Sequence, residues 1–515
     1  MSNSPPKKPR VFAPNLHLFA FHLYKDPALI PTTPEKPNKD PDLMAATAAE
    51  NQKLWQTGQA LLDRFKIKDR LKITEQRGYR VDLLDRQDPE KVSLLLVSKI
   101  DLEAESFAIT GLAYPLRFHD TNILWLNLRR PEQENDQATK PISLNFFQTL
   151  NPDHCFLPPQ IGSSLGQTLL LTIWKTPEKT WQFWRSPPNT QGLQQLSDQT
   201  LTAFLNGAPT PPKNYQGELF NSPIFEYGIP TDIEDYNHIL VWIFCEPATD
   251  QKFQDCYSSL IDLFAYRNKI IKSYQNSRQL YQVIAQEYQN IEAEIDRIFP
   301  KLSNKISLET KVLEDFKQYL QASPAIYLEF TRSLRDLEHC RLTIQINTKN
   351  YQQVITHIQQ QYPDEKLGFL QHFVQEDCQL FLEQIQADLG YYQSMTALLD
   401  NALNTIRGRV EIEQAEIDRS LERKIEILGA GLGAGSIIAS AISGHIDKPP
   451  ITPQGNTQIY PAVTSVVLSI LASLLIGVIV GCFNGTISIP KFLNARQNID
   501  PELPKSKKKS DRTQI

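Results

Sequence analysis

The sequence predicts an α/β or α+β N-terminal domain, a long antiparallel helical stalk with coiled-coil packing, and two C-terminal transmembrane helices. Three observations predict this fold. Residues 16–248 alternate strand-like and helix-like runs, and residues 249–426 carry apolar side chains at 3-4 spacing. The segments 427–444 and 461–486 contain no charged residue. Residues 1–15 are expected to form a disordered tail, 445–460 an outer loop, and 487–515 a basic tail.

Composition limits the classes of function. A chain of 515 residues exceeds the size at which a single core keeps growing, so several structural units are expected. The formal net charge of -5 gives no basic field for a phosphate backbone, which argues against a nucleic-acid partner. The six cysteines include no CxxC pair, which favours reduced thiols in a cytosolic compartment.

The N-terminal domain is expected to contain a buried sheet. Its candidate strands are apolar at both odd and even positions, which is typical of strands covered on both faces. They are the runs 16–24, 92–100, 123–129, 168–174 and 238–245, with a helix expected over 43–65. The last run ends just before Thr249, which is a candidate cap for the first long helix.

Chemical motifs are scarce in this domain. There is no GxxxxGK[ST], GxGxxG, GxSxG or HExxH motif, so the sequence indicates no enzyme and no cofactor, and leaves the metal unknown. His17 and His22 are expected on opposite faces of one strand, where they cannot share a ligand. The adjacent residues Asp153, His154 and Cys155 favour a loop over a catalytic group, and the Gly/Ser-rich run 162–168 favours a turn.

Two very long helices are predicted, over about 249–300 and about 364–444. Each has an apolar seam, which coiled-coil packing explains. The first seam contains Ile270, Tyr274, Tyr281, Ile284, Tyr288, Ile291, Ile295, Ile298 and Leu302, with Ser277 as its polar member. The second contains Ile385, Leu389, Tyr392, Leu399, Leu403, Ile406, Val410, Ile417, Leu421 and Leu428. Shorter helices that wrap this pair are expected between them.

The two uncharged segments predict an integral protein of the cell inner membrane, with the lipid bilayer as a partner. The second is long and apolar enough for a hydrocarbon core of about 30 Å, whereas the first is rich in glycine and serine. Lysine and arginine flank the two segments on their outer ends, and the loop between them holds only Lys448. Both termini are therefore expected in the cytoplasm.

This order of parts resembles the CorA family of divalent-cation transporters. The resemblance implies a homo-oligomer held through the stalk and spans, a channel-like fold, and a divalent cation as a candidate partner. In that family the first span ends in Gly-Met-Asn at the outer mouth of the pore. Here the corresponding place holds Ser443, Gly444, His445, Ile446 and Asp447, so the signature is absent and no residue role can be transferred.

A stripe of small and polar residues follows one face of the first span. Its members recur at intervals of three and four and are Gly429, Gly433, Ser436, Ser440, Ser443 and Asp447. One interpretation is a pore lining with a ring of Asp447 at its mouth. The other, which we favour, is that small residues let this helix approach a neighbouring helix closely.

Three functions remain open. The first is a homo-oligomeric ion channel or transporter with a cytoplasmic sensing domain. The second is a non-conducting, membrane-anchored coiled-coil protein that recruits partners, and the third is a ligand-triggered effector that perturbs the membrane. The basic run 505–509 indicates a determinant of topology, with weak attraction to anionic lipids.

Overall fold

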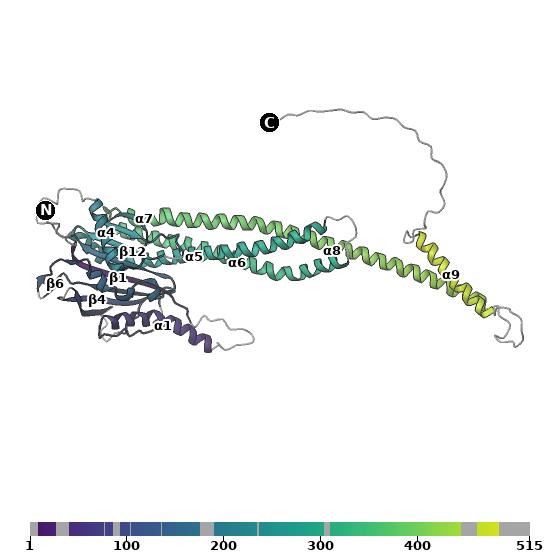
Figure 1. Cartoon of the computed structure of the whole chain (residues 1–515), viewed down its shortest axis with the longest axis horizontal. Coiled ribbons are helices and arrows are strands. Elements are labelled where there is room, and N and C mark those ends of the chain that lie inside the picture. The colour runs from purple at the N-terminus through teal and green to yellow at the C-terminus, as the bar shows by residue number, and fades with distance from the viewer. Residues whose placement is uncertain are drawn as a thin grey trace, which may run out of the picture. The chain divides into compact units, whose positions relative to one another are not determined.

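The computed structural model describes residues 9–26, 41–76, 78–85, 93–102, 105–134, 136–175, 190–233, 236–302, 310–443 and 461–483 (Figure 1). The chain divides into two compact units. Unit 1 consists of residues 1–295 and 323–399, and unit 2 of residues 296–322 and 400–515.

A mixed sheet forms the centre of unit 1. Its described strands are β1 (Arg10–Leu23), β2 (Arg80–Asp82), β3 (Leu94–Leu102), β4 (Glu105–Phe118), β5 (Thr121–Arg129), β8 (Ile142–Ser143), β9 (Gly166–Trp174), β10 (Lys213–Leu219), β11 (Ser222–Tyr227) and β12 (His238–Phe244). The order is β10-β11-β12-β9-β1-β5-β4-β2, with β3 also paired to β4 and β8 to β1. The pair β12 and β9 is parallel, and the other paired strands run antiparallel. A separate ribbon joins β6 (Gln133–Glu134) to β7 (Gln137–Ala138).

Helices cover both faces of this sheet. One face packs on α1 (Pro41–Arg64), α2 (Phe146–Leu150), α3 (Pro158–Ile161) and α4 (Thr190–Leu205), and the other on α5 (Pro247–Leu302) and its neighbours. Alternate residues of a strand therefore enter different cores. Phe19 and Phe21 of β1 face α5, whereas Leu18 and Ala20 face the α1 side. This double burial is why the strands are apolar at both parities.

The structure confirms the five predicted strands and the helix α1, but it adds others. β4, β10 and β11 were not predicted. β4 contains Gly111 and Pro115, and both residue types ordinarily weaken a strand. Gly111 is required there, because an added Cβ would lie 1.9 Å from the carbonyl oxygen of Asn127. β1 begins at Arg10, inside the segment predicted as a tail, because Arg10 and Val11 pair with β8.

Three long helices follow the sheet, where two had been predicted. They are α5, α6 (Thr310–Gln361) and α8 (Cys378–Ser443), with α7 (Gly368–His372) and the π-helical turn η4 (Phe373–Asp377) before α8. The prediction of several shorter helices between the long ones was wrong. A proline ordinarily ends a helix, but α6 continues through Pro324. Phe316 and Phe330, on either side of it, are fully buried, and this packing outweighs the backbone hydrogen bond lost at the proline.

Within unit 1, α6 runs antiparallel to α5 and α8. Tyr274 of α5 stacks on Phe381 of α8 at 4.0 Å between ring centroids, and Tyr281 lies 5.8 Å from Tyr392 further along both helices. Phe330 of α6 lies beside Tyr392, at 6.3 Å. Most of the predicted seam is buried here, although Tyr281 is 36% exposed.

The start of α5 differs from its prediction. The helix begins at Pro247, a residue well suited to the first helical turn, so Thr249 is inside the helix and does not cap it. Its buried hydroxyl donates a hydrogen bond to the carbonyl oxygen of Phe220 at 2.8 Å. Thr249 therefore fixes α5 to the turn between β10 and β11.

Unit 2 has a small apolar core of its own. It is made by Ile298, Leu313, Phe316, Ile406 and Val410. Further along α8 the seam is exposed: the exposed fractions of Ile417, Leu421 and Leu428 are 47%, 55% and 65%. Unit 2 also contains α9 (Pro461–Phe483). Among the residues that the structure describes, no helix is both long and apolar enough to cross a membrane, so the two predicted transmembrane helices are not confirmed.

His17 lies in an aromatic cluster on the α5 face of the sheet. It accepts a hydrogen bond from the indole Nε1 of Trp125 at 3.2 Å, stacks on that ring and on Phe19, and meets the edge of Phe253. His22 lies on the other face, near Glu50 of α1, which confirms that the two histidines are separated by the sheet. Burial, with a smaller contribution from the charge of Arg129, lowers the pKa of His17 to about 3.

This pKa predicts a loss of stability in acid. Between the unfolded value of 6.5 and about 3, the unfolded chain binds a proton at His17 that the folded protein does not. His17 should therefore remove up to about 1.4 kcal/mol of unfolding free energy per pH unit as the pH falls through this window. Measured by urea unfolding between pH 7 and pH 4, the unfolding free energy of His17→Gln should fall less steeply with pH than that of the wild type. The exposed His339→Gln serves as a control and should keep the wild-type slope; equal slopes for all three proteins would refute the assignment.

Candidate functional site

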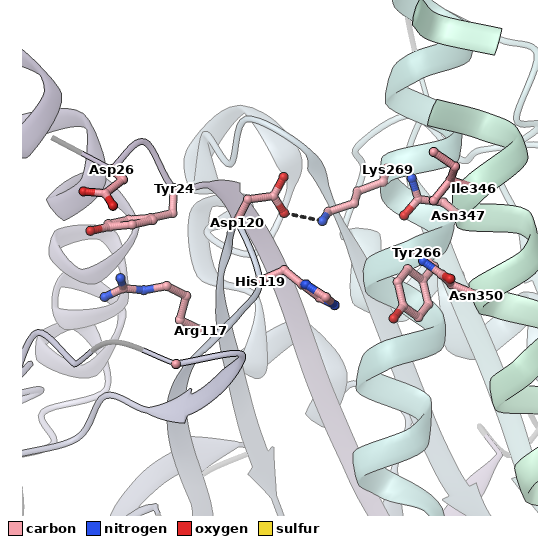
Figure 2. A pocket seen from close by; sticks show the side chains of 11 residues that line it. Tyr24, Asp26, Arg117, His119, Asp120, Tyr266, Lys269, Ile346, Asn347 and Asn350 are labelled. Atoms are coloured by element: carbon pink, nitrogen blue, oxygen red, sulfur yellow. Dashed lines mark hydrogen bonds and ion pairs between the residues drawn. The ribbon is translucent and has the colours of Figure 1, made fainter. Parts of the chain in front are cut away.

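A cleft of about 740 Å³ opens in unit 1 between the end of the sheet and two of the long helices. The turn from β4 to β5 forms its floor, the segment after β1 forms one end, and residues of α5 and α6 form the opposite wall (Figure 2). Segments far apart in the chain therefore meet at one polar surface.

The β4–β5 turn places two polar side chains in the cleft. His119 has a left-handed backbone conformation with φ of 55°, and Asp120 follows it. Lys269 of α5 reaches across and binds the Asp120 carboxylate (Figure 2). Burial would raise the pKa of Asp120, but the hydrogen bond from Lys269 brings it below its ordinary value. Burial and the nearby Lys269 charge lower the pKa of His119, which favours its neutral form.

Arg117 is the most unusual residue of the cleft. Its side chain is only 7% exposed, and its guanidinium carbon lies 3.8 Å from the centre of the Tyr24 ring. Within the described part of the chain, it forms no ion pair with a carboxylate, and its Nε is a buried donor without an acceptor. Arg117 therefore brings to the cleft a buried positive charge that no described carboxylate pairs with.

The helical wall supplies an aromatic ring and amide groups. Tyr266 comes from α5, and Asn347 and Asn350 come from one face of α6 (Figure 2). The Asn347 amide donates to the carbonyl oxygen of Thr343 at 2.7 Å. Cationic donors, amides and rings together have the chemistry of a binding site for a polar small molecule.

A second polar group is buried where β11, α5 and the π-helical turn η4 meet. Arg267 forms an ion pair with Glu226, and Asn214 donates to the same carboxylate oxygen at 3.0 Å. The guanidinium carbon of Arg267 lies 3.9 Å from the Phe373 ring centre. Burial alone would lower the pKa of Arg267, but the Glu226 charge raises it above its ordinary value. These side chains are enclosed, so this group links elements of unit 1.

The predicted stripe residues are only partly described. Gly429, Gly433 and Ser436 lie on exposed helix in α8, where the Ser436 hydroxyl donates to the carbonyl oxygen of Gly433 at 2.8 Å. A Cβ added at Gly429 or Gly433 would have nothing within 4 Å. Ser440 and Ser443 are in the same helix, with side chains outside the described set, and Asp447 lies outside the described residues.

The weaker motifs of the N-terminal domain have structural positions. Asp153 forms an ion pair with Arg64 of α1 at 2.7 Å, and burial raises the pKa of the Cys155 thiol to about 12. The Gly/Ser-rich run 162–168 is a turn into β9, as predicted, in which Ser164 accepts a hydrogen bond from the Leu23 amide at 2.8 Å. Among the described residues, no group of three or more His, Cys, Asp or Glu is placed to hold a metal ion.

Comparison with known protein families, with curated protein sequences and with solved structures found no match. The function must therefore be inferred from the residues themselves. The cleft was not among the sequence predictions, because its residues come from separate segments with no shared motif. One signal was present: Arg117 is a charged residue within the otherwise uncharged run 107–118, so it required a polar environment in the fold.

Proposed function

We propose that this chain is a homo-oligomeric membrane protein that conducts ions, with a divalent cation as the permeant species and the N-terminal domain as a cytoplasmic sensor. The observation that carries the proposal is the exposed apolar surface of α9, although no described helix meets both the length and the hydropathy of a membrane span. The helix has no charged residue over Pro461–Phe483. Eight large apolar side chains along it are 45% to 62% exposed, namely Val466, Val467, Ile470, Leu471, Leu474, Leu475, Val478 and Ile479. Such a surface is stabilised by lipid or by other apolar helices.

The glycines of α8 support assembly from several copies. Small residues in a membrane helix permit close approach of another helix. Within the described residues, the space beside Gly429 and Gly433 is open. In the packing interpretation a helix of a second copy fills this space. In the pore interpretation several copies around an axis instead turn the stripe from Gly429 to Asp447 toward a shared path. The architecture is similar to that of CorA transporters, although it lacks their Gly-Met-Asn signature.

Two measurements on the full chain test the proposal. The subunit number, measured by native mass spectrometry in detergent, should exceed one. Liposomes that contain the protein should take up Mg²⁺ or another divalent cation faster than empty liposomes. An oligomer without flux would support the alternative of a membrane-anchored interaction protein. Leakage of a large dye would support the alternative of a membrane-perturbing effector.

The pore interpretation also predicts the effect of a substitution at Asp447. Asp447→Asn should reduce cation flux by roughly fivefold or more, because one unit charge at 4 Å contributes on the order of 1 kcal/mol even in water. Asp447→Glu retains the charge and should conduct nearly as the wild type. If all three proteins show the same flux and the same dependence on cation concentration, Asp447 does not lie at the pore mouth.

A further inference from the structure

The cleft of unit 1 contains a buried positive charge, Arg117, that no described carboxylate pairs with. Removing a guanidinium from water is costly unless an anion or several acceptors replace the water. Arg117 is only 7% exposed, and the ring of Tyr24 covers one face of its guanidinium. Stacking leaves the N–H edge of a guanidinium free to donate. No described carboxylate accepts from it, so the cleft itself is where an anion can bind.

Neither described carboxylate of the cleft, Asp26 or Asp120, forms an ion pair with Arg117. Asp120 is already bound by Lys269, and Asp26 lies beside Tyr24, at the end of the cleft away from Lys269 (Figure 2). Lys269 is 13% exposed, whereas its partner Asp120 is 59% exposed and can turn toward solvent. An arriving anion can therefore be held by Lys269 as well as by Arg117. The neutral His119 between them offers a further donor or acceptor.

The rest of the wall fits an organic group attached to the anion. Tyr266 supplies a ring, and Asn347 and Asn350 supply amides that can pair with a polar heterocycle or sugar. A volume of about 740 Å³ exceeds the need of an inorganic ion and falls in the range of sites for small organic ligands.

We propose that this cleft binds an organic phosphate, with its phosphoryl group at Arg117 and Lys269 and its organic part against Tyr266, Asn347 and Asn350. Guanidinium groups bind phosphate through two parallel hydrogen bonds, which a lone lysine cannot form. The phosphate would be the ligand that the N-terminal domain senses. Only this regulatory role depends on the proposed function; binding to the cleft does not.

The test is calorimetric titration of the full chain in detergent with AMP, ribose 5-phosphate, inorganic phosphate and adenosine. AMP and ribose 5-phosphate should bind, inorganic phosphate should bind more weakly, and adenosine should not bind at millimolar concentration. Arg117→Gln should weaken AMP binding by about tenfold or more, because a hydrogen bond to a charged group contributes about 1.5–3 kcal/mol. The AMP affinity of Arg117→Lys should lie between those of the wild type and Arg117→Gln, because lysine keeps the positive charge but cannot form two parallel hydrogen bonds.

Arg332→Gln is the matched control, since Arg332 is an exposed residue of α6 outside the cleft. It removes the same charge and should bind AMP as the wild type does. If Arg117→Gln has a lowered melting temperature, Asn350→Asp tests the same site by adding a negative charge to the wall. This variant should also weaken AMP binding at least several-fold. The proposal is wrong if no phosphate binds, if adenosine binds as tightly as AMP, or if the folded cleft variants bind like the wild type. Phosphate binding without ion flux would retain this inference and reject the channel.

Discussion

Replacing Arg267 by methionine is expected to lower the free energy of unfolding by about 3–5 kcal/mol, because the Glu226 carboxylate would remain buried without its counter-ion. Glu226 is only 4% exposed, and the described groups left beside it are the Asn214 amide and the His238 Nε2, which lies 3.8 Å from the same oxygen. The loss should appear as a lower urea midpoint for the full chain in detergent. Tryptophan fluorescence can report it, because the buried Trp242 of β12 lies in the same core as α5.

Two further variants distinguish the buried pair from a general effect of removing arginine. Arg335→Met removes an arginine whose pair with Asp336 is exposed on both sides, at 70% and 51%. It should change stability by no more than about 1 kcal/mol. The double variant Arg267→Met with Glu226→Leu removes both charges and should recover part of the loss. If Arg267→Met is no worse than Arg335→Met, the pair does not hold β11 to α5.

The sheet could be predicted from sequence where the strands carry unbroken apolar runs, including β3, whose Leu95 and Val97 are nevertheless exposed. β5, β9 and β12 are apolar at both parities, and all three lie in the interior of the strand order. β4 escaped prediction because its pairing tolerates Gly111 and Pro115, and this tolerance depends on neighbours that are distant in the chain. α6 was divided for the same reason, since packing on both sides of Pro324 maintains a helix that local propensity would end.

The cleft shows why binding sites of this kind are harder to predict than folds. Arg117, Lys269 and Asn350 are separated by 152 and 81 residues along the chain, so no local spacing connects them. What local sequence can show is a residue that does not match its surroundings. Arg117 in an otherwise uncharged strand and Ser277 in an apolar seam are both residues of this kind. The Ser277 hydroxyl, however, donates a hydrogen bond to the carbonyl oxygen of Tyr274 in its own helix. Only the structure separates the two cases.

Replacing Ile417, Leu421 and Ile425 together by glutamine is expected to dissociate the protein into smaller species. These residues follow the buried seam residues Ile406 and Val410 along α8, and their exposed fractions are 47%, 55% and 60%. Apolar residues repeated along one face of a helix are the pattern of a coiled coil, and the proposed occupant of the exposed part is the same segment of a second copy. Burying each such side chain contributes about 1.5–3 kcal/mol, so the loss of three per subunit should strongly weaken the proposed assembly.

The matched control changes three exposed polar residues of the same segment, Glu416, Arg419 and Glu422, to glutamine. It removes no apolar surface, so the subunit number measured by light scattering in detergent should stay that of the wild type. The melting temperature of the N-terminal domain should be the same in both triple variants, because Leu399 is the last residue of α8 in unit 1. If the apolar variant keeps the wild-type subunit number, residues 417–425 of α8 do not join the copies, and the proposed contact at Gly429 and Gly433 becomes the one to test. A wild-type protein that is already a monomer would remove the need for a partner on this seam and, with it, the channel.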